Sequence, residues 1–182
     1  MTGPREGTHP AVFLDRDGTV MEEVNYCRHP GDVRVFPDAG NALRRLKQHG
    51  FKLIVITNQS GIGRGYFTEE EYSRVHAEFL SQLGDGLIDG AYFCPDAPET
   101  GSRRRKPSPE MVFEAARDHD LDLRQSYFVG DKAIDVECGK AAGVRTVLVQ
   151  TGYGLTETAC APDWIARHLA DAAEIILSNA DE

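Results

Sequence analysis

The sequence has no long apolar run, and this absence excludes a membrane-spanning helix. Even its longest apolar stretches are short runs such as Leu53 to Ile56. A membrane span needs roughly 20 consecutive apolar residues. The first ten residues are polar and contain proline and glycine, without the apolar centre of a signal peptide. We therefore expect a cytoplasmic protein that does not act at a membrane, with residues 1–10 as a flexible N-terminal tail.

Cysteine is scarce too, and the four cysteines lie far apart in the chain. Cys27, Cys94, Cys138 and Cys160 form no Cys-x-x-Cys pair, which argues against a thiolate metal cluster and a disulfide framework. Positive charge is in deficit, since the formal net charge is −9. Such a charge disfavours binding to nucleic acid or to an anionic membrane. It does not exclude a small phosphorylated substrate, which senses only its own pocket.

What the sequence contains is an alternation of apolar runs and amphipathic stretches, which predicts alternating strands and helices. At this spacing the alternation predicts one α/β domain, residues 11–182, with a mainly parallel sheet and helices on both faces. The predicted strands cover residues 11–14, 51–56, 91–94, 126–129 and 144–149, with a weak sixth strand around Trp164. The predicted helices follow Asp38, Thr68 and Ser108 and span residues 133–142 and 168–177.

Polar residues with catalytic potential follow four of these predicted strands. Parallel sheets bind their ligands beyond the carboxyl ends of the strands. Asp15 and Asp17 follow the first strand, and residues 57–60 follow the second. Lys106 ends the loop after the third strand, and residues 130–135 follow the fourth. We therefore expect these side chains to meet at one edge of the sheet.

Asp15 and Asp17 form the first candidate pair. Two carboxylates at this spacing can aim at one locus if the chain bends at Gly18. One carboxylate can then attack phosphorus while the other handles protons. The alternative is an ordinary aspartate-rich turn that ends a strand.

Asp131 and Asp135 lie four residues apart near a predicted helix start. They could cap the free backbone N–H groups of that helix. Together with Asp15 they also suit Mg²⁺, which prefers carboxylates, waters and phosphate oxygens. We expect Asp131 to hold the metal. For Asp135, metal ligation and helix capping are equally plausible roles. Lys106 can neutralise a phosphoryl group, and Thr57 and Ser60 supply hydroxyls.

In this order, the motifs Asp15-x-Asp17-Gly-Thr, Thr57, Lys106 and Gly130-Asp131-x-x-x-Asp135 resemble the four motifs of the haloacid dehalogenase (HAD) superfamily. The resemblance implies a Rossmann-like fold. It also implies that Asp15 is the nucleophile, that Asp17 is the general acid and later the base, and that Thr57 and Lys106 hold the phosphoryl group. Mg²⁺ would be held by the Asp15 side chain, the Asp17 carbonyl and Asp131.

A closer likeness is to the D,D-heptose 1,7-bisphosphate phosphatases, in the histidinol-phosphatase-like group. It rests on residues 13–19, 57–65, 105–107, 129–132 and 151–152. It implies a phosphorylated sugar as substrate, with loss of the 7-phosphate of the heptose bisphosphate. The substrate-binding residues that it implies are Arg16, Glu23, Val24, Asn25, Tyr26, Asn58, Gln59, Ser60, Arg105 and Lys132.

The sequence departs from this family after the third strand. Many members carry a zinc loop that starts Cys-Pro-His and ends Cys-x-Cys. Here Cys94-Pro95 is followed by Asp96, and no further Cys or His precedes Arg105. One thiolate cannot make a four-ligand structural site, so we expect no zinc and read Cys94 as a buried thiol. No segment is long enough for a separate cap domain, so we expect an open site walled by residues 19–36 and 95–106.

Other functions use the same residues. A phosphatase for histidinol phosphate or another sugar phosphate would need the same machinery. A DNA 3′-phosphatase is disfavoured by the acidic charge and by the lack of a basic stripe. A non-catalytic phosphate sensor would not need both Asp15 and Asp17. We expect a monomer without nucleic-acid partners, and we expect the histidines at positions 29, 49, 76, 119 and 168 to be solvated.

Overall fold

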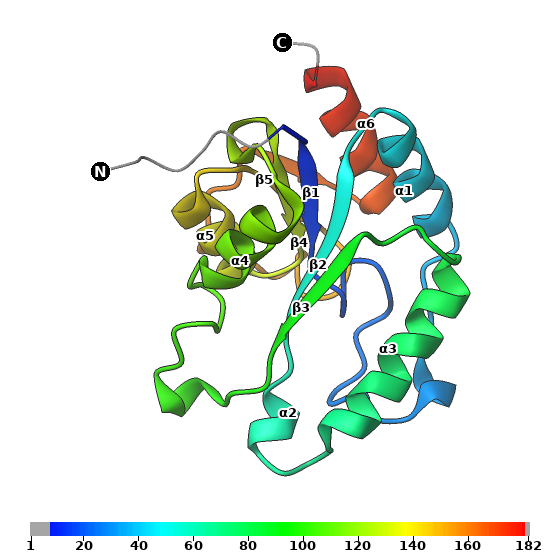
Figure 1. Cartoon of the computed structure of the whole chain (residues 1–182), viewed down its shortest axis with the longest axis vertical. Helices are drawn as coiled ribbons and strands as arrows, with labels where there is room; N and C mark the ends of the chain where they lie inside the picture. The colour runs from blue at the N-terminus through cyan, green and yellow to red at the C-terminus, as the bar shows by residue number, and fades with distance from the viewer. Residues whose placement is uncertain (1–7, 181–182) are drawn as a thin grey trace.

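The computed structural model describes residues 8–180, and its six strands form one parallel sheet (Figure 1). From one edge to the other, the strand order is β3-β2-β1-β4-β5-β6. The chain winds outward from β1 to β3 and then returns to place β4 on the other side of β1. Ligands of open parallel sheets bind at such a switch point, beyond the strand ends. The strands are β1 (Ala11–Leu14), β2 (Lys52–Asn58), β3 (Gly90–Cys94), β4 (Tyr127–Gly130), β5 (Arg145–Val149) and β6 (Trp164–Ala166).

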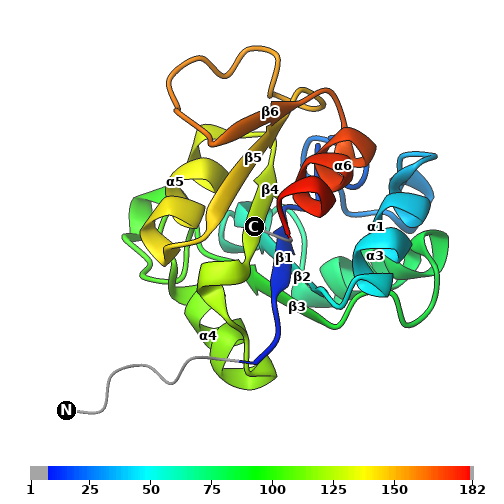
Figure 2. The ribbon, with the colours of Figure 1, turned by 90° about the horizontal axis from the view of Figure 1, so that it is seen from above.

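Helices cover both faces of the sheet (Figure 2). One face packs against α1 (Ala39–Gln48), α3 (Glu69–Leu83) and α6 (Leu169–Asn179). The other face packs against α4 (Glu110–His119) and α5 (Ala133–Ala142). The central strands β1 and β4 are buried along their whole lengths, as their continuous apolar runs predict. The predicted fold class is confirmed.

Local signals place most of the helix ends correctly. Thr68 caps α3 through a reciprocal capping box, in which Glu71 N–H donates to Thr68 Oγ1 at 3.1 Å and Thr68 N–H donates to Glu71 Oε2 at 2.8 Å. Gly143 ends α5 with a left-handed φ of 79°. The helix predicted after Ser108 begins at Glu110, with Pro109 rather than Ser108 at the capping position. No helix within residues 8–180 has both the length and the apolar character needed to cross a membrane.

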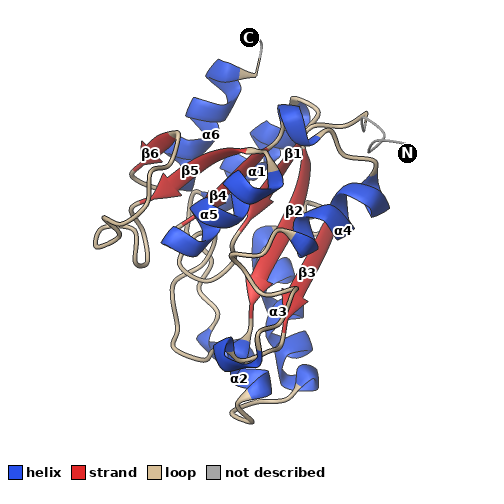
Figure 3. Cartoon of the chain, turned by 90° about the vertical axis from the view of Figure 1, so that its left-hand side faces the viewer, coloured by secondary structure: helices blue, strands red, loops and turns tan. Residues whose placement is uncertain are grey.

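The sequence gives no signal for the single-turn helix α2 (Ser60–Gly63), which contains two glycines. Figure 3 shows it at the end of the sheet toward which the arrowheads of β2 and β3 point. Tertiary contacts define α2, because the Gly63 N–H donates to the Pro95 carbonyl at 2.9 Å. A Cβ atom at Gly61 would lie 2.1 Å from the Phe67 ring. Short 3₁₀ turns at residues 30–32, 98–100 and 123–125 complete the structure.

One expectation about the surface, the solvation of His76, needs correction. Of the predicted flexible tail, residues 1–7 lie outside the described residues, but the N–H groups of Thr8 and His9 donate to the Asp120 carbonyl at 2.9 and 3.2 Å. His76 is not solvated: its ring lies against Tyr72 and Phe79, and its Nδ1 is buried. Burial, helped by the nearby Arg16 charge, lowers the pKa of His76 to about 4, so the ring is neutral at pH 7.

Candidate active site

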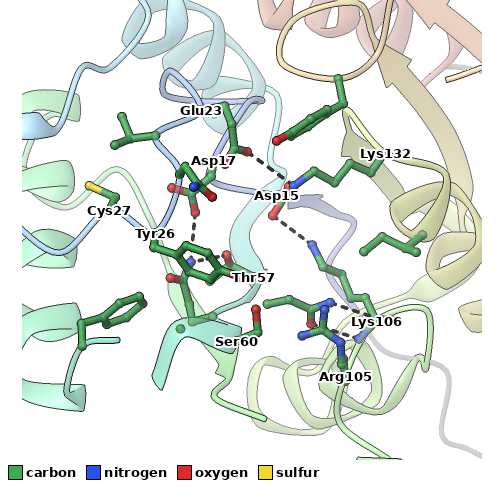
Figure 4. A pocket seen from close by; sticks show the side chains of 18 residues that line it. Asp15, Asp17, Glu23, Tyr26, Cys27, Thr57, Ser60, Arg105, Lys106 and Lys132 are labelled. Carbon is green, nitrogen blue, oxygen red and sulfur yellow. Dashed lines mark hydrogen bonds and ion pairs between the residues drawn. The ribbon is translucent and has the colours of Figure 1, made fainter. Parts of the chain in front are cut away.

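The carboxyl ends of β1, β2 and β4 converge on a cavity of about 200 Å³ (Figure 4). Most of the side chains expected there from the sequence line it, and Asp15 and Lys106 meet at its floor. The expected open site is walled by residues 23–27 on one side and by Arg105 and Lys106 on another. The lining residues are Asp15, Asp17, Glu23, Val24, Asn25, Tyr26, Cys27, Thr57, Asn58, Gln59, Ser60, Gly61, Phe67, Arg105, Lys106, Lys132, Ile134 and Tyr153.

A buried ion triad holds Lys106 at the cavity floor. Its ammonium lies 2.9 Å from Asp15 Oδ1 and 2.7 Å from Asp135 Oδ1, and it donates to the Ile56 carbonyl at 2.8 Å. Burial alone would lower the pKa of Lys106, but Asp135 and Asp15 outweigh it and raise that pKa. Lys106 is therefore a permanent cation beside the Asp15 carboxylate.

Asn58 and Asp135 position this lysine, and Asn58 also lines the cavity. The Asn58 side chain accepts from Lys106 N–H at 3.1 Å and donates to the Lys106 carbonyl at 3.2 Å. Asp135 Oδ2 also accepts from Lys132 N–H at 3.1 Å, so one carboxylate both caps α5 and pairs with Lys106. Burial raises the pKa of Asp135 to about 6, and the Lys106 charge opposes that rise, so Asp135 is still mainly ionised at pH 7. Asp135 therefore fills one of the two roles that the sequence left open, the capping of α5, and metal ligation by Asp135 stays a prediction.

Asp17 lies two residues beyond Asp15, and Gln59 ties it to β2. The Gln59 amide donates to Asp17 Oδ2 and to Thr57 Oγ1, both at 2.9 Å. Thr57 is 1% exposed, at the end of β2. The bend directly after Asp17 needs Gly18, whose φ is +86° and whose added Cβ would lie 2.3 Å from Asp131 Oδ2.

Arg16 departs from the expectation of substrate contact. Its side chain is completely buried and does not line the cavity. It points beneath the site, where its guanidinium pairs with the Asp17 carboxylate at 3.0 Å. A side chain pointing inward between two outward-facing aspartates is what strand-like alternation produces. Arg16 therefore cannot touch a ligand in this cavity.

Three buried carboxylates can share a cation. Asp15, Asp131 and Asp135 each offer an oxygen within 4.8 Å of the others. Space around Asp131 is kept by two glycines, since a Cβ at Gly152 would lie 2.2 Å from Asp131 Oδ2. Asp131 itself is oriented by Thr19 Oγ1 at 3.3 Å and by the Tyr153 N–H at 2.9 Å. An oxygen-only set of this charge fits a hard divalent cation such as Mg²⁺.

Because the pKa of Asp131 is shifted, we predict that the stability of the metal-free protein depends on pH. Burial, followed by the nearby Asp15 charge, raises the pKa of Asp131 to about 8. The unfolded chain loses this proton near pH 4, as an ordinary aspartate does. Between about pH 4 and 8 the folded state thus holds a proton that the unfolded state has lost. Stability should fall as pH rises through this window, by up to about 1.4 kcal/mol per pH unit.

Thermal unfolding in a chelator from pH 5 to pH 8.5 measures this effect. Asp131→Asn should flatten the slope, and Mg²⁺ should stabilise the wild type more at pH 8 than at pH 5, because a bound cation keeps Asp131 ionised. An unchanged slope in Asp131→Asn would contradict the assignment.

Tyr153 forms a wall of the cavity that was not predicted from the sequence. Tyr153, after β5, places its ring 4.7 Å from Lys132 Nζ, which pairs with Glu23 at 3.4 Å across the cavity. Burial raises the pKa of Glu23. Tyr153 lies in a Gly-Tyr-Gly turn that follows the end of β5. Ligands of parallel sheets bind beyond the strand ends, so this position could have indicated Tyr153 as it indicated Lys106. Cys27, Phe67 and Ile134, which also line the cavity, have no comparable sequence signal.

Side chains fix the loop after β3 without a cysteine cluster. Arg104 forms a two-pronged pair with Glu114 at 2.8 and 2.7 Å and donates to the Phe93 carbonyl at 3.0 Å. Arg105 donates to the Asp96 carbonyl at 3.0 Å. Cys94 is buried at the end of β3, as expected, with Sγ 3.6 Å from Asp96 Oδ2.

Comparisons with known proteins agree with this geometry. Residues 103–172 match a family model described as HAD-hydrolase-like. The chain is 39% identical to the D-glycero-D-manno-heptose-1,7-bisphosphate 7-phosphatase of Thermosynechococcus vestitus, over 93% of this chain and 96% of that protein. It is also 39% identical to the D-glycero-beta-D-manno-heptose-1,7-bisphosphate 7-phosphatase of Escherichia coli K12, over 92% and 93%.

A solved structure gives the same fold with ligands. It is the D,D-heptose 1,7-bisphosphate phosphatase of B. bronchiseptica, complexed with magnesium and phosphate. The TM-score is 0.86 at 32% identity, and the match covers 94% of this chain and 99% of that one.

Proposed function

This chain belongs to the D-glycero-D-manno-heptose-1,7-bisphosphate 7-phosphatase family of HAD-like hydrolases, and on that premise we propose that it removes the 7-phosphate of such a heptose bisphosphate through a phospho-aspartate on Asp15. The observation that carries the proposal is the buried contact between Lys106 and Asp15, at 2.9 Å on the floor of an open polar cavity. A lysine so placed neutralises both the nucleophile and the phosphoryl group that approaches it.

The first half-reaction transfers the phosphoryl group to the enzyme. The Asp15 carboxylate attacks phosphorus, an O–P bond forms, and the ester P–O bond breaks with its electron pair left on the sugar oxygen. Asp17 gives that oxygen a proton, so the sugar leaves as an alcohol. Thr57, Lys106 and the backbone of residues 58–61 steady the equatorial phosphoryl oxygens.

The second half-reaction restores the enzyme. Asp17, now ionised, takes a proton from water, and the resulting hydroxide attacks phosphorus. The bond between phosphorus and Asp15 breaks, and inorganic phosphate leaves. Asp15, Asp131 and the Asp17 carbonyl would hold Mg²⁺, which when bound offsets the negative charge of the phosphoryl group.

The cavity also supports a sugar as the substrate. Glu23, Asn25, Tyr26 and Lys132 line the cavity and supply charged and polar groups that suit sugar hydroxyls. Ser60 and Gln59 line the same cavity. Arg105 at the rim is suited to a second phosphate, because a guanidinium binds phosphate oxygens well.

Phosphate release by purified protein with Mg²⁺ tests this function. The substrates are heptose 1,7-bisphosphate, histidinol phosphate, fructose 1,6-bisphosphate and a 3′-phosphorylated oligonucleotide. We expect the heptose bisphosphate to give the highest kcat/KM, with one phosphate released per sugar. Preference for another ester would keep the mechanism and reject the substrate, and Mg²⁺ and phosphate binding without turnover would indicate a sensor.

We also predict that the purified protein carries no stoichiometric zinc. The ion pair of Arg104 with Glu114 and the packing around Cys94 supply contacts that hold this loop. Elemental analysis should find less than one zinc per chain, and a zinc-selective chelator should leave the unfolding temperature unchanged. Stoichiometric zinc that resists dialysis would overturn this prediction.

A further inference from the structure

Arg16 is a buried cation that the proposed mechanism does not use. Its side chain has no solvent exposure, although arginine is almost never fully buried unless paired. Asp17 is its anionic partner in the described part of the chain, and Nη1 is buried there without a hydrogen-bond partner. Burial alone would lower the pKa of Arg16, but Asp17 outweighs it and raises that pKa. Burying the Arg16 and Asp17 charges costs desolvation energy, which suggests that this ion pair has a function.

The two Arg16 donors fix the plane of the Asp17 carboxylate. Nε donates to Asp17 Oδ2 at 3.1 Å, and Nη2 donates to Oδ1 at 3.2 Å. Gln59 adds a bond to Oδ2 at 2.9 Å from the side of β2. Oδ2 thus accepts two of these bonds and Oδ1 accepts one, so Oδ1 has more capacity to exchange a proton.

Arg16 is itself held at both ends. Its guanidinium carbon lies 5.3 Å from the centre of the Tyr72 ring, and that ring packs on Phe93 at 4.4 Å. Its carbonyl accepts from the N–H groups of Val20 and Met21 at 3.0 and 3.2 Å. These contacts anchor both the side chain and the backbone of Arg16 beside Asp17.

We infer that Arg16 is a positioning residue that aims Asp17 at the leaving-group oxygen, with Tyr72 holding Arg16 in place from beneath the cavity. This inference rests on the acid role proposed for Asp17 and adds the residues that set its direction. Proton transfer needs a donor within about 3 Å of the acceptor in the correct orientation. A carboxylate free to rotate would meet this condition for a smaller fraction of encounters.

The test compares two leaving groups. A sugar alkoxide needs the proton from Asp17, whereas p-nitrophenolate leaves without one. The measured quantity is kcat/KM, which reports the steps up to formation of the phospho-enzyme. For Arg16→Met, we expect kcat/KM with the sugar phosphate to fall about 10- to 100-fold. A general acid supplies ~10²–10⁴-fold, and misorienting Asp17 should lose part of that. With p-nitrophenyl phosphate kcat/KM should fall less than about 3-fold, because that ester makes no use of the acid.

Matched variants separate positioning from folding. Tyr72→Leu should show the same leaving-group dependence, and it keeps the test available if Arg16→Met does not fold. The exposed Arg44 offers a control, since Arg44→Met should leave both rates unchanged. Equal losses on both esters in Arg16→Met and Tyr72→Leu would overturn the inference.

Asp17→Asn distinguishes this failure from failure of the proposed function. If Asp17→Asn shows strong leaving-group dependence and Arg16→Met shows none, then Asp17 is the acid and Arg16 does not aim it. If Asp17→Asn affects both esters equally, the acid role itself is wrong, and the inference falls with it.

Discussion

Replacing Asp15 by Asn is expected to lower kcat by on the order of 10⁴- to 10⁶-fold, as loss of a catalytic nucleophile does elsewhere. The amide is nearly the same size as the carboxylate but cannot form the phospho-enzyme. The fold should survive, because Lys106 keeps Asp135 as a partner at 2.7 Å. The Asp15 charge helps to raise the pKa of Asp131, so its loss should lower that pKa.

Two measurements check this prediction. Phosphate release should be undetectable above background, and the unfolding temperature in chelator should equal or exceed that of the wild type. Acid-quench labelling with a ³²P substrate should trap phosphate on the wild type and not on Asp15→Asn. Substantial turnover by a confirmed Asp15→Asn protein would rule out the covalent mechanism.

Replacing Lys106 by Met is expected to damage both activity and stability. The lysine is 2% exposed and lies within 3 Å of two carboxylates, at 2.9 Å from Asp15 and 2.7 Å from Asp135. Removing one partner from a buried ion pair costs about 3–5 kcal/mol, because the other charges remain buried. Loss of the phosphoryl-binding cation should lower kcat by about 10²- to 10³-fold or more.

A second substitution separates these two effects. Lys106→Met with Asp135→Asn removes the buried cation and one of its anions, so it should regain stability and stay inactive. Lys140→Met, on the exposed part of α5, is a matched control that should change neither property. Urea unfolding and phosphate release measure the two effects. A stable Lys106→Met protein would show that the ion triad does not support the fold.

The fold was predictable from the sequence because its main signals are local. Runs such as 11–14 and 126–129 are apolar throughout, because strands in the middle of a parallel sheet are covered on both faces. Thr68 with Glu71, and Gly143, mark helix ends through local bonds that need no distant partner. The helix α2 had no such signal, since contacts with Pro95 and Phe67 define it.

The site was predictable to the extent that it depends on strand ends. Asp15, Thr57 and Lys106 each follow a strand, and parallel strands bring their carboxyl ends to one edge. The direction of individual side chains was harder to predict. The family resemblance implied that Arg16 touches substrate, but the structure buries its side chain away from the cavity. His76 was expected in water but lies among aromatic rings.

By itself, then, the sequence determined which elements form, in what order, and which polar residues reach the edge where the sheet binds ligands. These features depend on local spacing, on burial and on the geometry common to parallel sheets. Only the tertiary structure decided that Asp135 pairs with Lys106, that Asn58 clamps the same lysine, and that Arg16 supports Asp17 from below. Such pairings join residues from separate elements or depend on how one side chain turns, and a linear pattern of residue types does not encode either.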